Sequence, residues 1–122
     1  MDIRHLDRAA LSAENSWSQR LLPWPTLNSP FEGAQSVIRA GASSPRHAHH
    51  EYEIFVAVKG EAWIESHGER LPFVAGDIVH FPPGHEHQVI NDTDTDFEMF
   101  SIWWDTDMSQ AFGARHESEA GS

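Results

Sequence analysis

The chain has no cysteine, a single lysine and no long run of apolar residues. Without cysteine there is neither a disulfide nor a thiolate, so nitrogen and oxygen atoms must hold any bound metal. No stretch approaches the roughly 18 consecutive apolar residues that a transmembrane helix requires. Residues 1–7 include charges where a signal peptide needs an apolar core, so we expect a cytoplasmic protein.

Positive charge is also scarce. Eight basic residues face nineteen acidic ones, and the formal net charge is −11. Nucleic acid and anionic membrane surfaces are poor partners for such a field, so we expect a small molecule to be the partner instead. A length of 122 residues corresponds to one domain with one core.

Histidine is abundant by contrast, and three potential metal ligands occur between Gly41 and Gly60. On an extended segment, His47 and His49 point to the same face because side chains alternate with period two, and Glu53 has the same parity. Two imidazoles and one carboxylate suit iron(II), manganese, nickel or zinc, and they leave coordination positions open for water or substrate.

A second stretch, from Gly76 to Asn91, completes a recognisable pair of motifs. The first segment fits the pattern G-x5-H-x-H-x3-E-x6-G, and the second fits G-x5-P-x-G-x2-H-x3-N, without a departure in either. Together the two motifs resemble those of the cupin superfamily. The resemblance covers residues 41–91.

This resemblance implies a small β-barrel with one divalent transition metal as cofactor. Carried over position by position, it implies that the metal ligands are His47, His49, Glu53 and His87. Iron(II) is the favoured metal, while zinc, manganese and nickel remain alternatives.

The apolar pattern independently predicts an all-β protein. Residues 52–59 and 97–104 are apolar on both faces, as expected for covered strands. Further strands are expected near 35–40 and 86–91, with others between turns rich in glycine, proline and asparagine. Eight or nine short strands without an internal repeat favour a single-domain antiparallel β-barrel or jelly roll.

We expect three parts along the chain. Residues 1–33 form an N-terminal arm and an edge strand that cover the barrel, and residues 34–104 form the barrel core. Residues 105–122 begin with a short helix that Asp105 caps and Gly113 ends, followed by a frayed tail. The outer face of the strand at 52–59 must meet either the arm or a second subunit, and a homodimer is usual in proteins that this one resembles.

Other residues are candidates for the substrate pocket. Phe55 shares the face of Glu53, so it is expected to form a wall beside the metal. His85 follows a turn at the barrel mouth and is a candidate acid or base, or simply a residue of the rim. Gln35 and Arg39 share parity and could direct an amide and a guanidinium toward an anionic substrate, although a solvated strand face explains them equally well.

The sequence leaves several functions open. The favoured hypothesis is a metal-dependent enzyme that oxidises a small polar or carboxylated metabolite with molecular oxygen, and isomerase or lyase chemistry follows. A non-catalytic module that binds a small ligand through the metal is the alternative from a different class. The ending Ile102-Trp103-Trp104-Asp105, followed by Met108, is also faintly similar to zinc cupins that join nitrogen to nitrogen.

Overall fold

The structure, a computed structural model, describes residues 1–24 and 29–120. Residues 25–28, within the expected N-terminal cover, and 121–122, at the end of the expected tail, lie outside the described residues. The described chain contains eight strands and one α-helix. They are β1 (Ser18–Arg20), β2 (Glu32–Ile38), β3 (Tyr52–Lys59), β4 (Glu61–Ser66), β5 (Glu69–Val74), β6 (Ile78–Phe81), β7 (Gln88–Ile90), β8 (Phe97–Trp104) and α1 (Thr106–Ala120).

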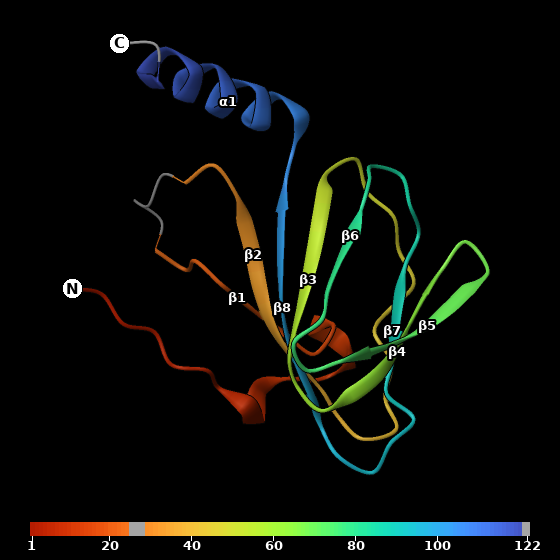
Figure 1. Cartoon of the computed structure of the whole chain (residues 1–122). Helices are drawn as coiled ribbons and strands as arrows, with labels where there is room; N and C mark the ends of the chain where they lie inside the picture. The colour runs from red at the N-terminus through yellow and green to blue at the C-terminus, as the bar shows by residue number, and fades with distance from the viewer. Residues whose placement is uncertain (25–28, 121–122) are drawn as a thin grey trace.

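The strands form two antiparallel sheets that face each other (Figure 1). The larger sheet has the order β1-β2-β8-β3-β6, and the smaller one has the order β5-β4-β7. Chain neighbours such as β3 and β4 therefore lie in different sheets, and Gly60 provides the turn between them with a φ of 89°. This arrangement confirms the antiparallel jelly-roll class that the apolar pattern predicts.

The core lies between the two sheets. Strands β3 and β8 each send alternate side chains inward, and in β3 these inward side chains are the buried ones while their neighbours are only partly buried. The buried cluster draws residues from both sheets: Ile38, Phe55, Ala57, Ala62, Ile64, Phe73, Phe81, Val89, Phe97 and Met99. Burial of ten apolar side chains at roughly 1.5–3 kcal/mol for each fully buried large one provides the main stabilisation.

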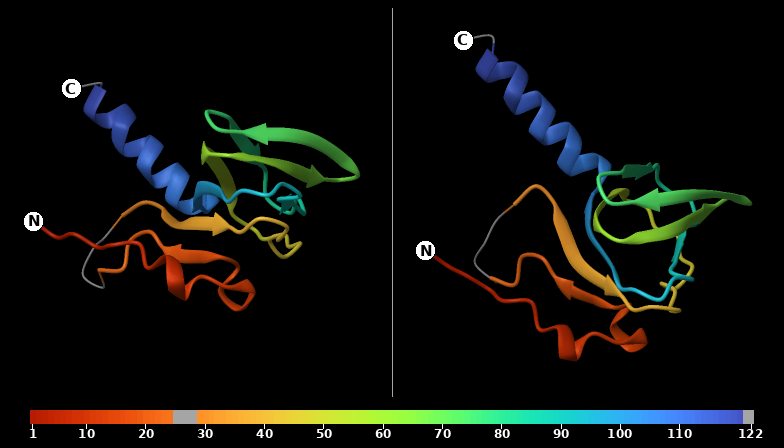
Figure 2. Two further views of the ribbon diagram at one scale, coloured as in Figure 1. Left: turned by 90° about the horizontal axis from the view of Figure 1, so that it is seen from below. Right: turned by 60° about the horizontal axis from the view of Figure 1, so that its bottom comes forward.

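The N-terminal segment lies against the outer side of the larger sheet (Figure 2). Arg4 donates to the Gln35 side chain at 2.8 Å, and Arg8 pairs with Glu98 at 2.7 Å. Both contacts join the segment to β2 and β8. Across the described residues, no helix is both long and apolar enough to cross a membrane.

The C-terminal helix is longer than predicted. Asp105 caps it as expected, because its Oδ1 accepts a hydrogen bond from the Met108 amide at 2.7 Å. The expected stop at Gly113 is wrong, since α1 continues to Ala120. Glycine disfavours a helix interior by only about 1 kcal/mol, so helical neighbours on both sides override it. The helix projects from the end of β8 beyond the sheets (Figures 1 and 2).

Two strands also differ from the prediction in their bounds. Strand β2 covers Glu32–Ile38 instead of 35–40, and residues 32–34 already pair with β8. Strand β7 covers only Gln88–Ile90 of the predicted 86–91, and the Asn91 side chain lies just after its end. It donates to the carbonyl of Ile38 at 2.9 Å and accepts from the Thr93 amide at 3.0 Å, so it fixes the following turn.

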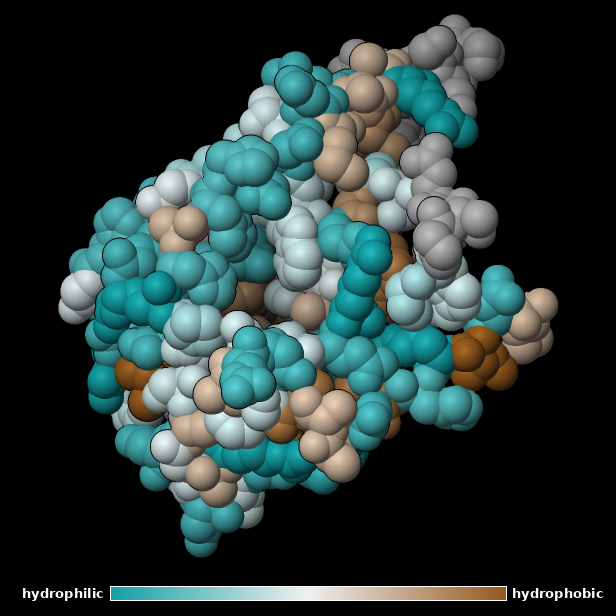
Figure 3. Space-filling view, turned by 180° about the vertical axis from the view of Figure 1, so that it is seen from behind, coloured by the Kyte–Doolittle hydropathy of each residue, from teal (hydrophilic) through white to brown (hydrophobic). Residues whose placement is uncertain are grey.

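The surface reflects the acidic composition. On the face shown in Figure 3, hydrophilic side chains predominate and apolar groups appear as separate small patches. Five arginines of the described surface pair with carboxylates: Arg8, Arg20, Arg39, Arg46 and Arg70.

Candidate metal centre

Backbone pairing brings the two histidine segments face to face. His47 and His87 form an isolated antiparallel bridge in which each amide donates to the other residue's carbonyl, at 3.3 and 3.0 Å. The carbonyl of His49 accepts from the Gly84 amide at 2.8 Å. The loop that follows β2 is thereby joined to the turn after β6, although about forty residues separate them.

Glu53 approaches these histidines from strand β3. It lies in the middle of the larger sheet, where β3 pairs with β6 on one side and β8 on the other, and only 3% of its surface is exposed. One potential ligand atom from each of His47, His49, Glu53 and His87 lies within 4.8 Å of the other three. The structure thus brings together the four residues that the cupin motifs imply.

The His87 ring has a defined orientation and tautomer. It stacks on Phe81 with a centroid distance of 4.2 Å, and Phe55 packs edge-on at 5.2 Å. Its Nδ1 lies 2.9 Å from the His85 carbonyl oxygen, which can only accept, so Nδ1 carries the proton. Its Nε2 therefore points at the cluster, in the arrangement of a metal-ligating histidine whose other ring nitrogen donates to a carbonyl.

Three buried atoms of the cluster make no hydrogen bond within the described structure: His49 Nδ1, Glu53 Oε1 and His87 Nε2. Glu53 Oε1 is only 2.8 Å from His87 Nε2 and 3.2 Å from His49 Nε2. So close an approach of a carboxylate oxygen to two ring nitrogens is favourable when a cation, a proton or a metal ion, lies between them. This arrangement fits a divalent metal ion.

Electrostatics keep His47 in the form that binds metal. Desolvation by partial burial lowers the pKa of His47 below its ordinary value, and the neighbouring His87 acts in the same direction, while Glu53 opposes both. The ring is consequently neutral at neutral pH, and neutral imidazole is the form that coordinates metals.

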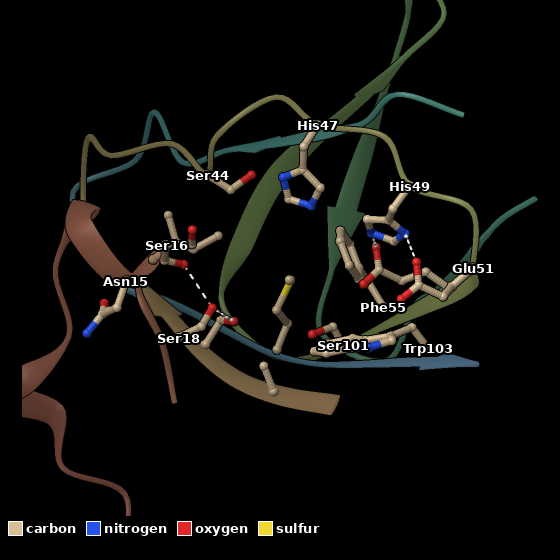
Figure 4. Close-up of a pocket in the computed structure, with 15 residues that line it drawn as sticks. Asn15, Ser16, Ser18, Ser44, His47, His49, Glu51, Phe55, Ser101 and Trp103 are labelled. Atoms are coloured by element: carbon tan, nitrogen blue, oxygen red, sulfur yellow. Dashed lines mark hydrogen bonds and ion pairs between the residues drawn. The ribbon is translucent and has the colours of Figure 1, made fainter. Parts of the chain in front are cut away.

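A cavity of about 420 Å³ opens beside the cluster (Figure 4). His47 and His49 project into it from one side, opposite Ser101 and Trp103 of β8. Its remaining walls combine apolar carbon with hydroxyl groups. The apolar walls include Ala34, Ile38, Phe55 and Met99, and the hydroxyl groups come from Ser16, Ser18, Ser36, Ser44 and Ser101.

Phe55 lines this cavity, as its parity with Glu53 predicts, but three other pocket candidates do not. Gln35 and Arg39 belong to the opposite face of the larger sheet, where Gln35 accepts from Arg4 and Arg39 pairs with Asp96 at 2.9 Å. The parity argument for them was sound, but the shared face is the outer one.

His85 is also displaced from the predicted site. Its ring stacks on His67 at a centroid distance of 4.4 Å and lines a separate hollow with Leu71 and His80. Only its backbone carbonyl serves the cluster, through the hydrogen bond with His87. The structure therefore does not support the predicted role of its imidazole as acid or base.

Sequence reasoning missed Glu51, Ser101 and Trp103 as lining residues. Glu51 follows the bend after His50, and its Oε1 lies 3.5 Å from His49 Nδ1. Ser101 and Trp103 share the odd face of β8 with Met99, so the parity of a buried neighbour could have identified them. Ser16 and Ser18 reach the cavity from the N-terminal region, and no sequence pattern indicates this.

Comparisons with known proteins agree with this geometry. A family model described as a cupin domain matches residues 35–103. A cupin 2 conserved barrel domain protein from Salinispora arenicola is 53% identical, with a TM-score of 0.81 and coverage of 95% of this chain and 98% of that chain. The plu4264 protein from Photorhabdus luminescens is 39% identical, with a TM-score of 0.80 and coverage of 96% and 99%.

A curated relative, an oxalate-binding protein from Thermotoga maritima, is 30% identical over 70 residues. The match covers 57% of this chain and 58% of that relative, so the chain spans little more than half the relative's length. The family model matches more than half of the chain, and the two solved structures share its fold over nearly their whole length. The chain therefore belongs to the cupin superfamily.

Proposed function

We propose that the protein is a metal-dependent enzyme that binds a small polar metabolite in the cavity and oxidises it with molecular oxygen. The observation that supports a metal is the set of buried atoms without hydrogen bonds at His49, Glu53 and His87. Three neutral imidazoles and one carboxylate would hold a divalent ion, with iron(II) favoured and zinc, manganese or nickel as alternatives. A bound ion would supply Lewis acidity and, if it is iron, redox chemistry.

The residues of the chain would each have a distinct task. The ligands His47 and His49 lie at the edge of the cavity, so substrate would approach the ion from this side. Phe55 and Trp103 would exclude water from the reacting group, which strengthens electrostatic interactions there. Glu51 is the carboxylate nearest to the ligands that is not itself one of them, and it is the candidate group to accept a proton from substrate.

The alternative is a module that binds a small ligand through the metal without chemistry. The curated relative named for binding oxalate favours this reading. Isomerase or lyase chemistry would use the same metal site. The faint similarity to zinc cupins that join nitrogen to nitrogen predicts instead that the bound metal is zinc and not iron.

We also propose that the active unit is a homodimer. The outward side chains of β3 and β8 include Ile54, Val56 and Ile102, which are only partly buried in the single chain. Ile54 lies opposite Ile102 in the pairing of β3 with β8. Val56 lies opposite Ile78 of β6, which is 66% exposed. The N-terminal segment contacts this face at Gln35 of β2 and Glu98 of β8, so a second subunit would cover the part formed by β3 and β6.

The test begins with elemental analysis of protein purified without added metal. Next, the metal-loaded protein is incubated aerobically with candidate metabolites while oxygen consumption and melting temperature are recorded. Catalysis predicts oxygen uptake that His49→Ala abolishes together with bound metal, whereas His67→Ala, which changes an exposed histidine outside the cluster, has no effect. A raised melting temperature without turnover would establish the binding module instead, and turnover by rigorously metal-free protein would contradict both proposals.

A further inference from the structure

The cavity beside the metal cluster has carboxylates on its walls but no basic side chain. Among the described residues that line it, Glu51 and Glu53 are the charged ones apart from the histidines, and neither arginine nor lysine is present. A neighbouring hollow that shares Glu51 and Trp103 with the cavity adds Asp105 and Glu32, of which Glu32 pairs with Arg20 at 2.7 Å outside the lining. The approach to the metal is thus acidic.

The basic residues closest to the site are engaged elsewhere. Arg46 directly precedes His47, but its guanidinium pairs with Glu65 at 2.7 Å and with Glu86 at 3.3 Å. Arg39 pairs with Asp96 at 2.9 Å on the other side of the larger sheet. Neither can reach the cavity without losing these contacts.

The charges around a bound ion then sum to zero before any ligand arrives. A divalent ion with the Glu53 carboxylate has a net charge of +1, and Glu51 contributes −1 beside it. A ligand that donates one anionic oxygen to the ion therefore already gives the site a net negative charge. A second anionic group would meet hydroxyls and apolar carbon with no counter-charge, and burying such a group is costly.

An uncharged polar group would find a partner in the same cavity. Ser101 is 5% exposed, and its side chain makes no hydrogen bond to any other described residue. It lies on the cavity face of β8 together with Met99 and Trp103 (Figure 4). By contrast, the hydroxyl of Ser36 is already bonded to Ser18 at 2.7 Å. A hydroxyl that faces the cavity and has no bond to the rest of the described chain is a position for a hydrogen bond to ligand.

We propose that the site selects ligands that bind the metal through a single oxygen-donor head group and have no second negative charge. This inference rests on the proposed metal-dependent function and narrows its substrate class. Dicarboxylates are disfavoured, and monocarboxylates or neutral chelators with an amide, hydroxyl or apolar remainder are preferred. The relative named for binding oxalate, which is a dianion, would then differ from this protein in ligand choice.

The experiment compares two ligands with the same head group. Cobalt-loaded protein is titrated with 2-hydroxyglutarate and with its 5-amide, which differ only in the charge of the distal group, and the visible spectrum of the cobalt is followed. We expect the amide to bind at least about tenfold more tightly, because the distal carboxylate repels Glu51 and loses its hydration. Equal binding, or tighter binding of the dianion, overturns the inference while leaving the metal site intact.

The other outcomes separate this inference from the proposed function. Protein that takes up no cobalt contradicts the metal site itself, and a loaded protein whose spectrum responds to neither compound contradicts both proposals. Glu51→Gln, measured at saturating cobalt, should reduce the preference for the amide several-fold. The control Glu61→Gln removes an exposed carboxylate outside the cavity and should leave the preference unchanged. An unchanged ratio in Glu51→Gln would assign the preference to something other than the charge of the site and would overturn the argument.

Discussion

Glu53 is the residue on which the chemistry of the site depends most directly. Its Oε1 lies 2.8 Å from His87 Nε2, and the Nδ1 of the same ring donates to the His85 carbonyl. Glu53 and His87 are both almost fully buried. A cation held between the carboxylate oxygen and the ring nitrogen would therefore be favoured.

Replacement of this carboxylate by its amide should separate metal binding from stability. Glu53→Gln retains the shape of the side chain, but its amide group can donate to His87 Nε2. We expect metal affinity, measured by competition with a chelator, to fall about 100-fold or more, because an anionic ligand is lost. The metal-free variant should nevertheless unfold in urea within about 1 kcal/mol of the metal-free wild type, because the amide can still form a hydrogen bond with His87.

Glu61→Gln is the matched control, because Glu61 is an exposed glutamate at the start of β4. It should change neither metal affinity nor stability. Metal affinity that survives in Glu53→Gln would show that Glu53 is not a ligand. A large loss of stability in the metal-free variant would show that the carboxylate is satisfied in another way.

At the scale of elements, the turns decide how the ligands meet. The turn at Gly60 transfers the chain from β3 in the larger sheet to β4 in the smaller sheet, and it packs against the beginning of β8. A Cβ added at Gly60 would lie 2.7 Å from the Asp96 carbonyl oxygen. Gly41, in the turn after β2, also has a positive φ, of 76°, but a Cβ added there would have nothing within 4 Å.

This pair separates backbone strain from close packing. Gly41→Ala should cost about 1–2 kcal/mol, the usual penalty for a non-glycine residue in left-handed conformation. Gly60→Ala should cost at least 1 kcal/mol more, about 2–4 kcal/mol in total, because the backbone of β8 must also move. Urea unfolding of both metal-free variants measures the difference. Equal losses would mean that the contact with Asp96 relaxes without cost.

At the scale of the whole molecule, the larger sheet has two unlike faces. Its inner face forms the core and the cavity, and the N-terminal segment contacts its outer face at Gln35 of β2 and Glu98 of β8. The uncovered part joins Ile78 to Val56 and Phe100 through the strand register. A charge placed in its centre would have to be buried in the proposed dimer.

Ile78→Glu should therefore convert the proposed dimer to a monomer. We expect the dimer dissociation constant to rise about 100-fold or more, measured by sedimentation or light scattering, because an unpaired carboxylate would be buried. Leu71→Glu places the same charge on β5 of the smaller sheet, where Leu71 is 51% exposed, and should leave association unchanged. A monomeric wild-type protein would contradict the dimer outright.

The sequence by itself determined the two central strands and the candidate ligand set. The predicted bounds of β3 and β8 match the structure because alternation and turn residues are local properties. The four candidate ligands are those that the resemblance to the cupin motifs implies, and the His47–His87 bridge aligns the two motifs. The helix end at Gly113 failed because the local preference of glycine is small.

Only the tertiary structure decided what surrounds the metal cluster. Parity places Gln35 and Arg39 on one face of a strand, but which face becomes the inner one depends on how the two sheets pack. The same packing excludes the His85 ring from the cavity and brings in Ser16, Ser101 and Trp103 from distant segments. Ligand spacing is encoded within short segments, whereas the pocket wall is assembled from residues up to nearly ninety positions apart, whose proximity no local pattern specifies.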